Sequence, residues 1–98
     1  MSVIEKIYME LKERKPNLSK RTFSTSYLGA SSGYMTTMTY YNREVSLKAL
    51  AYLRGTLATE VRAWEEISAT HNTERCKRNL QHAKRLYALA TEKLLAAC

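Results

Sequence analysis

Few residues in this 98-residue chain are suited to metal or catalytic chemistry. His71, Cys76 and His82 could each ligate zinc, but separations of five and six residues fit no common ligand set. All nine acidic residues are glutamates, and the chain contains no phosphate-binding glycine loop, zinc-protease helix motif, nucleophile elbow or Cys-x-x-Cys pair. We therefore expect no enzyme activity, no metal site and no cofactor.

The other chemically distinctive segment is residues 22–42, which contain no Asp, Glu, Lys, Arg or His but many Ser, Thr and Tyr hydroxyls. Lys20, Arg21 and Arg43 frame this segment, and the whole chain carries a formal net charge of +7. A small basic domain attracts anionic partners, of which nucleic acid is the commonest. The hydroxyl-rich segment and its flanking cations are therefore a candidate binding surface.

Helices must position these residues, because a single proline and three glycines leave too few turn signals for an all-β fold. Apolar residues with helical spacing after Ser2 predict a first helix of about three turns, which stops before Pro16. Ser19 or Thr22 can cap a second helix, which Gly29 ends.

Three further helices are predicted after this point. Ser31 can cap a third helix that continues to Tyr40. Ser46 can cap a long fourth helix, in which apolar residues recur at threes and fours as far as Ile67. Thr73 can cap a fifth helix that ends close to the C-terminus.

The last two helices are expected to form an antiparallel hairpin, because the turn between them is short and the last helix carries a heptad seam. That seam consists of Cys76, Leu80, Ala83, Tyr87, Ala90, Leu94 and Ala97. Leu86, Leu89 and Leu95 widen the apolar stripe, so it either covers the N-terminal helices or contacts a second protomer. We expect Trp64 to pack in the core or between the two long helices.

The expected architecture is all-α, with five helices in a single domain over residues 1–98. Residues 18–57 would form its core, and residues 58–98 the hairpin, a candidate dimerisation element. The sequence has no apolar run long enough to span a membrane, its N-terminus resembles no secretory signal, and Cys76 and Cys98 are too few for a disulfide scaffold. We therefore expect a cytoplasmic protein with no membrane partner.

A known sequence pattern covers about residues 18–57. It consists of a Leu-Gly turn, a small apolar residue, a Ser cap, apolar residues four and seven positions after the cap, and a leucine-rich helix. Its positions are held here by Leu28, Gly29, Ala30, Ser31, Met35, Met38, Leu47, Leu50, Leu53 and Leu57. This segment resembles the phage repressor/Cro-like helix-turn-helix family. The whole chain also resembles small bacterial proteins, and that second resemblance implies no function.

The helix-turn-helix resemblance implies a DNA-binding transcriptional regulator of bacterial or phage type, in which the helix starting near Ser31 enters the major groove of duplex DNA. Lys20, Arg21 and Arg43 would contact phosphates. Hydroxyl hydrogen bonds and thymine-methyl contacts would come from Ser32, Gly33, Tyr34, Thr36, Thr37 and Tyr40. Because such proteins usually bind paired half-sites, a homodimer is expected.

The chain departs from the family pattern at three points. Phe23-Ser24 stand in place of a Leu-Ala pair, one residue further from Gly29 than usual, and the glutamine that often opens this helix is missing. Val45 stands in place of a proline before the leucine-rich helix. The expected recognition helix also has no Arg, Lys, Gln or Asn before Asn42, and these residue types most often contact guanine and adenine.

A second interpretation assigns the hydroxyl-rich segment to protein binding. The chain would then be a non-enzymatic helical adaptor that docks a protein partner through its Tyr/Thr-rich face, with the repressor-like core as scaffold. Joint replacement of Lys20, Arg21 and Arg43 distinguishes the two interpretations, because only DNA binding depends on phosphate contacts.

Overall fold

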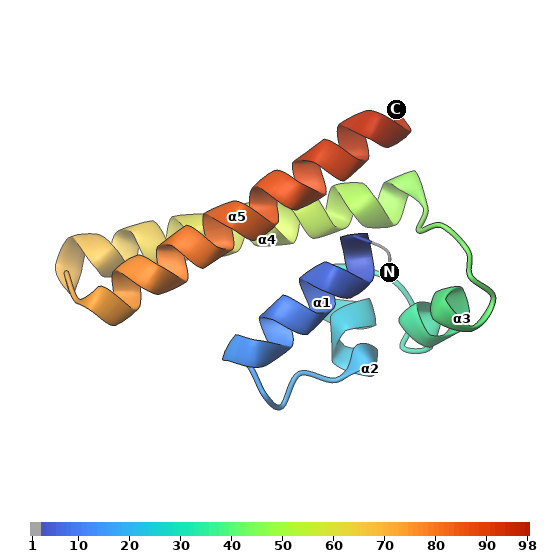
Figure 1. Ribbon diagram of the computed structural model, residues 1–98, viewed down its shortest axis with the longest axis horizontal. Helices are drawn as coiled ribbons and strands as arrows, with labels where there is room; N and C mark the ends of the chain where they lie inside the picture. Colours follow the sequence, from blue (N-terminus) through green and yellow to red (C-terminus); the bar gives the residue numbers. More distant parts are fainter. Residues whose placement is uncertain (1–2) are drawn as a thin grey trace.

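A computed structural model describes residues 3–98, and every regular element in that range is a helix (Figure 1). The elements are α1 (Val3–Arg14), α2 (Lys20–Thr22), η1 (Phe23–Tyr27), α3 (Tyr34–Tyr40), α4 (Leu47–Thr70) and α5 (Glu74–Ala97). Since η1 continues α2 without a break, they form five helical segments in the described residues, and the all-α prediction is confirmed. The predicted cap at Ser2 lies outside the described residues.

The two longest helices, α4 and α5, lie side by side as an antiparallel hairpin (Figure 1). Both begin at the predicted caps: the Ser46 side chain accepts a hydrogen bond from the Ala49 backbone N–H at 3.2 Å, and the Thr73 side chain accepts one from the Cys76 N–H at 3.2 Å. Helix α4 passes through Gly55 without interruption. The predicted division between residues 18–57 and residues 58–98 therefore falls inside α4, which belongs to both parts.

The core lies where α1 and η1 pack against one end of this hairpin. Its largest fully buried side chains are Phe23, Ile7, Leu11, Leu28, Leu50, Leu53, Leu57 and Leu86. Leu86 and Leu89 pack into this core, so this part of the α5 stripe covers the N-terminal helices, whereas Leu95 is 69% exposed. The core placement of Trp64 is wrong: its side chain is only half-buried and does not belong to the core, because it lines an open hollow beside Arg14 and Lys15.

The second helical segment contains a widened turn. The Ser19 side chain accepts a hydrogen bond from the Thr22 N–H at 3.1 Å, so Ser19 is its cap. From Phe23 the segment continues as a π-helix, and the Leu28 N–H donates to the Phe23 carbonyl five residues earlier at 3.2 Å. A π turn holds one residue more than an α turn. In the sequence, Phe23-Ser24 likewise lie one residue further from Gly29 than the corresponding pair of the family pattern.

Gly29 makes the turn after this segment. Its φ of +60° lies in the left-handed region, which glycine adopts without steric cost. A Cβ at this position would also lie 2.6 Å from Cδ2 of the Tyr52 ring on α4. Gly29 therefore permits both the turn and the close approach of α4.

The predicted cap of the third helix is wrong: the cap position is Gly33, two residues after Ser31. Helix α3 begins at Tyr34, and Ser31 contributes only its backbone carbonyl, which accepts from the Tyr34 N–H at 3.1 Å. The side-chain cap comes instead from Ser24 on η1, which is completely buried; its Oγ accepts from the Met35 N–H at 2.9 Å and donates to the Lys20 carbonyl at 2.8 Å. The Ser24 hydroxyl thus satisfies an N–H in the first turn of α3, so residues 31–33 need not supply a side-chain cap.

Candidate nucleic-acid interface

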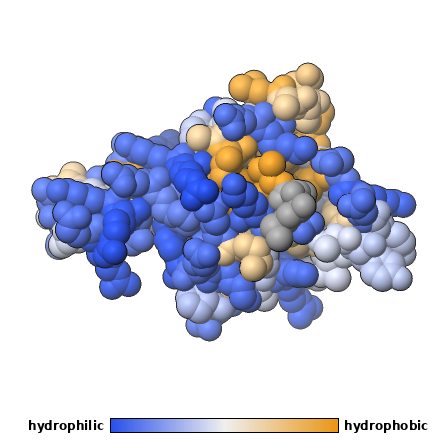
Figure 2. All heavy atoms as spheres, viewed as in Figure 1, coloured by the Kyte–Doolittle hydropathy of each residue, from blue (hydrophilic) through white to orange (hydrophobic). Residues whose placement is uncertain are grey.

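The outward face of α3 is rich in exposed hydroxyls. The predicted base-contacting residues that are exposed are Ser32, Gly33, Thr36, Thr37 and Tyr40. Met35 on the opposite face is 2% exposed and fixes α3 to the core. Helix α3 lies at one edge of the molecule in Figure 1, and Figure 2 shows pale, intermediate hydropathy in that region. The outward face of α3 is therefore an accessible, uncharged surface able to donate and accept hydrogen bonds.

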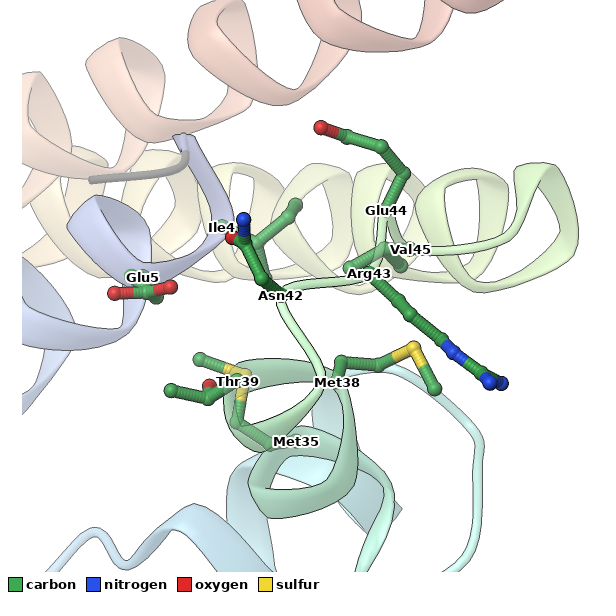
Figure 3. Close-up of a pocket in the computed structure, with 9 residues that line it drawn as sticks. All are labelled: Ile4, Glu5, Met35, Met38, Thr39, Asn42, Arg43, Glu44 and Val45. Carbon is green, nitrogen blue, oxygen red and sulfur yellow. The ribbon is translucent and has the colours of Figure 1, made fainter.

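Two predicted phosphate contacts lie beside α3. Lys20 lines a small groove of about 100 Å³ together with Met35 and Thr39 of α3. Arg43 lines a second groove of about 290 Å³ that also includes Met38 and Thr39 (Figure 3). Both cations thus share Thr39 as a neighbour, and they adjoin α3 through separate grooves.

Arg43 and Arg21 complete the set of predicted cations. The Arg43 guanidinium lies 5.3 Å from the centre of the Tyr41 ring, within the range of a cation–π contact. Arg21 follows Lys20 on α2 and is exposed. None of the four ion pairs that the structure describes among residues 3–98 involves Lys20, Arg21 or Arg43, although the Glu5 carboxylate lines both grooves and the Glu44 carboxylate lines the larger one.

Tyr34, the remaining predicted base contact, has a structural role. Its half-buried side chain packs against the core, and its hydroxyl accepts a hydrogen bond from the Ser46 N–H at 3.0 Å. Ser46 is the cap of α4, so Tyr34 joins the start of α3 to the start of α4. Thr36, Thr37 and Tyr40 are consequently better placed than Tyr34 to contact a ligand.

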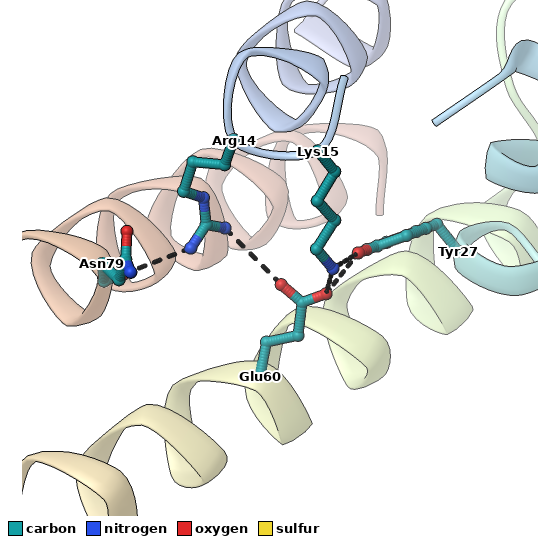
Figure 4. A network of polar contacts seen from close by, with 5 residues as sticks. All are labelled: Arg14, Lys15, Tyr27, Glu60 and Asn79. Carbon is teal, nitrogen blue, oxygen red and sulfur yellow. Dashed lines mark hydrogen bonds and ion pairs between the residues drawn. The ribbon is translucent and has the colours of Figure 1, made fainter. Parts of the chain in front are cut away.

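A polar network that the sequence did not predict joins the end of α1, η1 and α4 (Figure 4). The Tyr27 hydroxyl on η1 donates to the Glu60 carboxylate on α4 and accepts from Lys15 Nζ at 2.5 Å. Lys15 Nζ also lies 3.1 Å from Glu60 Oε2, and Arg14 Nη2 lies 3.6 Å from Glu60 Oε1. These contacts fix η1 and the end of α1 against the hairpin. No sequence signal could have revealed them, because Glu60 lies far along the chain from its partners.

The charges in this network stabilise one protonation state. Burial lowers the pKa of Lys15, but the Tyr27 hydroxyl and the Glu60 carboxylate outweigh burial, so the pKa lies above its ordinary value of 10.5. Burial and the hydrogen bond to Glu60 raise the pKa of Tyr27 above 10.0. At neutral pH the lysine is therefore charged and the tyrosine is a neutral donor.

The residues first considered for metal chemistry do not come together. Among residues 3–98, no group of three or more His, Cys, Asp or Glu side chains is arranged to hold a metal ion. Cys76 and Cys98 are both free thiols. None of the helices within the described range combines the length and apolar character needed to cross a membrane.

The fold defines an all-helical domain in which the N-terminal helical segments pack against one end of a long antiparallel hairpin. The chain belongs to a family of unknown function, DUF6626, whose model matches residues 4–97. No curated protein and no solved structure matches the chain.

Proposed function

We propose that this protein is a small DNA-binding regulator that places the outward face of α3 in the major groove of duplex DNA. The observation that carries the proposal is the exposed hydroxyl face of α3, a helix with no carboxylate of its own, with Lys20 and Arg43 in the two adjoining grooves that Glu5 and Glu44 also line. In a helix-turn-helix protein, the second helix contacts base edges while neighbouring cations contact phosphates. The net charge of +7 adds a favourable long-range attraction to the duplex.

The widened turn in η1 supports the proposed relation to phage repressor/Cro-like proteins. One extra residue separates Phe23-Ser24 from Gly29, and the π turn absorbs one extra residue. Ser24, which stands in place of the usual alanine, also caps α3. The offset and the serine of the Phe23-Ser24 departure thus both have a structural account that is compatible with the proposed helix-turn-helix.

The chemistry of the α3 face favours a mode of recognition with few strong base contacts. Thr36 and Thr37 can hydrogen-bond to base edges and contact thymine methyl groups, and Tyr40, which is 80% exposed, can do so with its hydroxyl. Since the face has no Arg, Gln or Asn to form bidentate pairs, phosphate contacts by Lys20, Arg21 and Arg43 would provide most of the affinity.

A homodimer is part of this proposal, because two copies of α3 could then occupy successive half-sites. Figure 2 shows apolar side chains gathered over the C-terminal end of α5, where Leu95 is 69% exposed. Analytical ultracentrifugation of the wild-type protein and the Leu95→Glu variant tests this part. We expect a dimer that Leu95→Glu converts to a monomer; a monomeric wild-type protein at tens of micromolar, roughly the range of weak homodimers, would contradict it.

DNA binding is tested by selecting duplexes from a random pool and titrating the enriched sequence by fluorescence anisotropy at several salt concentrations. We expect an enriched motif bound with nanomolar affinity, roughly the range of specific regulators. The triple variant Lys20→Gln, Arg21→Gln, Arg43→Gln should weaken binding and lower the salt slope by about two to three. Binding without an enriched motif that disappears by about 200 mM salt would contradict the proposal.

The matched control changes the same number of charges elsewhere. Arg62, Lys77 and Lys84 are exposed residues of the hairpin, and none forms an ion pair within residues 3–98. The triple variant Arg62→Gln, Lys77→Gln, Lys84→Gln has the same net charge as the test variant, so it measures non-specific attraction alone. A separate variant, Thr37→Val, keeps the shape of the side chain and removes its hydroxyl, and it should alter the preferred sequence more than the affinity.

An alternative is a protein-binding adaptor, and one observation favours it. Tyr40 and Tyr41 are 80% and 59% exposed, and their rings form an edge-to-face pair with centres 4.9 Å apart. Exposed tyrosines are typical of protein interfaces. In this alternative Tyr40→Ala abolishes partner binding, whereas the triple replacement of Lys20, Arg21 and Arg43 has little effect.

A further inference from the structure

A groove rich in guanidinium groups lies between the C-terminal end of α1 and one face of α5. Its volume is about 380 Å³, and its lining residues are Glu13, Arg14, Arg75, Arg78, Asn79 and His82. A second hollow of about 370 Å³ shares Glu13, Arg14, Arg75 and Asn79 and adds Lys15 and Trp64. The shared residues make the two hollows one continuous surface, called the arginine groove below, in a size range typical of small-ligand sites.

The arginine groove is strongly cationic. Arg75 and Arg78 lie one turn apart on α5, both are exposed, and neither forms an ion pair with any carboxylate of the described chain. Glu13 is the one carboxylate among the residues that line it. Two free guanidinium groups at this spacing can bind one multivalent anion together, because each presents a planar fork of donors.

Arg14 gives the groove a fixed element. Its side chain is only 16% exposed, and it is held by Glu60 Oε1 at 3.6 Å from Nη2 and by the Asn79 carbonyl at 3.5 Å from Nη1 (Figure 4). Its Nε, like Nδ1 of His82, is buried and has no hydrogen-bond partner among residues 3–98. Buried polar atoms without partners are rare, so these two atoms retain hydrogen-bonding capacity on residues that line the groove.

Trp64 gives the same surface an apolar wall. It is half-buried on α4 and lines the hollow together with Arg14, Lys15 and Arg75. A half-exposed indole beside cations can pack against a planar or sugar-like group whose anionic part is held by the arginines. Trp64 is also the single tryptophan of the chain, so its fluorescence reports directly on this surface.

We propose that the arginine groove binds a small organic phosphate monoester, with its phosphate on Arg14, Arg75 and Arg78 and its organic part against Trp64. A phosphate monoester fits this donor set because it carries close to two negative charges and three acceptor oxygens at neutral pH. A mononucleotide is the best match, since a nucleobase offers a flat surface to the indole.

This site is separate from the proposed DNA-binding face. In Figure 1 the groove elements, the end of α1 and the first half of α5, lie toward the opposite side of the molecule from α3. A duplex seated on α3 would present phosphate diesters to Lys20, Arg21 and Arg43. The ligand of the arginine groove is therefore a small molecule that could be bound at the same time as DNA.

Titration of the full chain with adenosine monophosphate, ribose 5-phosphate, inorganic phosphate and adenosine, monitored by Trp64 fluorescence, tests this proposal. We expect saturable binding of adenosine monophosphate below about 1 mM, weaker binding of ribose 5-phosphate and inorganic phosphate, and none of adenosine. The double variant Arg75→Gln, Arg78→Gln should weaken nucleotide binding by about tenfold or more. The control Lys77→Gln, Lys84→Gln has the same net charge and should change it by less than about twofold, since neither lysine lines the groove.

Three results would overturn the proposal. One is no saturable fluorescence change with any phosphate up to about 10 mM. Another is equal weakening by the two double variants, which would mean non-specific attraction. The third is a fluorescence change with a 5′-hydroxyl duplex that depends on Arg75 and Arg78 while the monophosphates do not bind, because the groove would then belong to a DNA surface. Both double variants replace exposed side chains, and circular dichroism verifies that they fold.

Discussion

The two ends of the α4–α5 hairpin have the same apolar periodicity but differ in burial. Residues 47–60 and 83–97 form the proximal hairpin, where Leu53 and Leu86 are both 0% exposed. Residues 61–82 form the distal hairpin, in which every residue is at least partly exposed. A heptad pattern therefore specifies which helix faces which, but it does not specify how deeply a residue is buried.

The reason for the difference is a third layer of structure. At the proximal hairpin, α1 and η1 cover part of the seam between α4 and α5, so Leu53, Leu57 and Leu86 are completely buried there. At the distal hairpin only the end of α1 reaches α5, where Arg14 bonds to the Asn79 carbonyl, so part of each seam residue is left in water. This end can therefore carry cations such as Arg75 and Arg78, whose burial would be costly in a core.

The largest expected effect is in the proximal hairpin. Leu53→Ala removes a completely buried side chain and should lower the free energy of unfolding by about 2 to 5 kcal/mol. Urea denaturation followed by circular dichroism measures this loss. A change below about 1 kcal/mol would mean that the proximal hairpin is no better packed than the distal hairpin.

The second expected effect concerns the connection between η1 and α3. Ser24→Ala removes the Oγ that accepts from the Met35 N–H, and it leaves that N–H without its partner. We expect a loss of about 1 to 3 kcal/mol in unfolding free energy. Thr25→Ala, which changes an exposed hydroxyl on the next residue, is the matched control and should cost less. Equal losses in the two variants would remove the assigned capping role of Ser24.

These two residues show how far the sequence can predict this fold. Leu53 was predictable because its burial follows from a local helical period and a hairpin turn. The caps at Ser46 and Thr73 were predictable for the same reason, since each bonds to an N–H three residues later. Ser24 was not, because it caps a helix that begins ten residues away, and the nearer Ser31 offered a plausible local cap.

The candidate binding surfaces also combine features that follow from local sequence with features that depend on the tertiary fold. The exposure of Thr36 and Thr37 followed from the helical period of α3, once Met35 was assigned to the core. The engagement of the Tyr34 hydroxyl by Ser46 did not follow, because it depends on how α3 and α4 meet. The arginine groove likewise requires that Arg14 of α1 and Arg75 of α5 be brought together by the tertiary fold.

The third expected effect is in the distal hairpin. Leu80→Ala makes the same chemical change as Leu53→Ala, but Leu80 is already partly exposed. Because less apolar surface is returned to water, we expect a loss of about 1 kcal/mol, measured by the same urea denaturation. A loss equal to that of Leu53→Ala would show that the distal hairpin is covered in solution, as a second copy of the chain could do. Repeating the measurement at several protein concentrations distinguishes that case, since dimer stability depends on concentration.

The smallest expected effect is a pH dependence at the boundary between the two hairpin regions, where His82 lies. Burial lowers the pKa of His82 below 6.5, the Arg14 and Arg85 guanidinium groups lower it further, and the Glu10 and Glu13 carboxylates partly oppose them. The unfolded chain therefore takes up this proton at a higher pH than the folded chain, so the stability of the fold decreases as the pH falls through 6.5.

The His82→Gln variant tests this effect through unfolding free energies measured between about pH 7.5 and 5.5, a range above the ordinary pKa values of carboxylates. The stability of the wild-type protein should decrease toward the acidic end, and that of His82→Gln should decrease less. His71→Gln is the control, because His71 is exposed in the turn between α4 and α5, and it should behave like the wild-type protein. Parallel pH profiles for wild-type and His82→Gln would mean that His82 is as well hydrated as the rest of the distal hairpin. Helix α1 would then not shield the His82 side chain, which lines the arginine groove, from water.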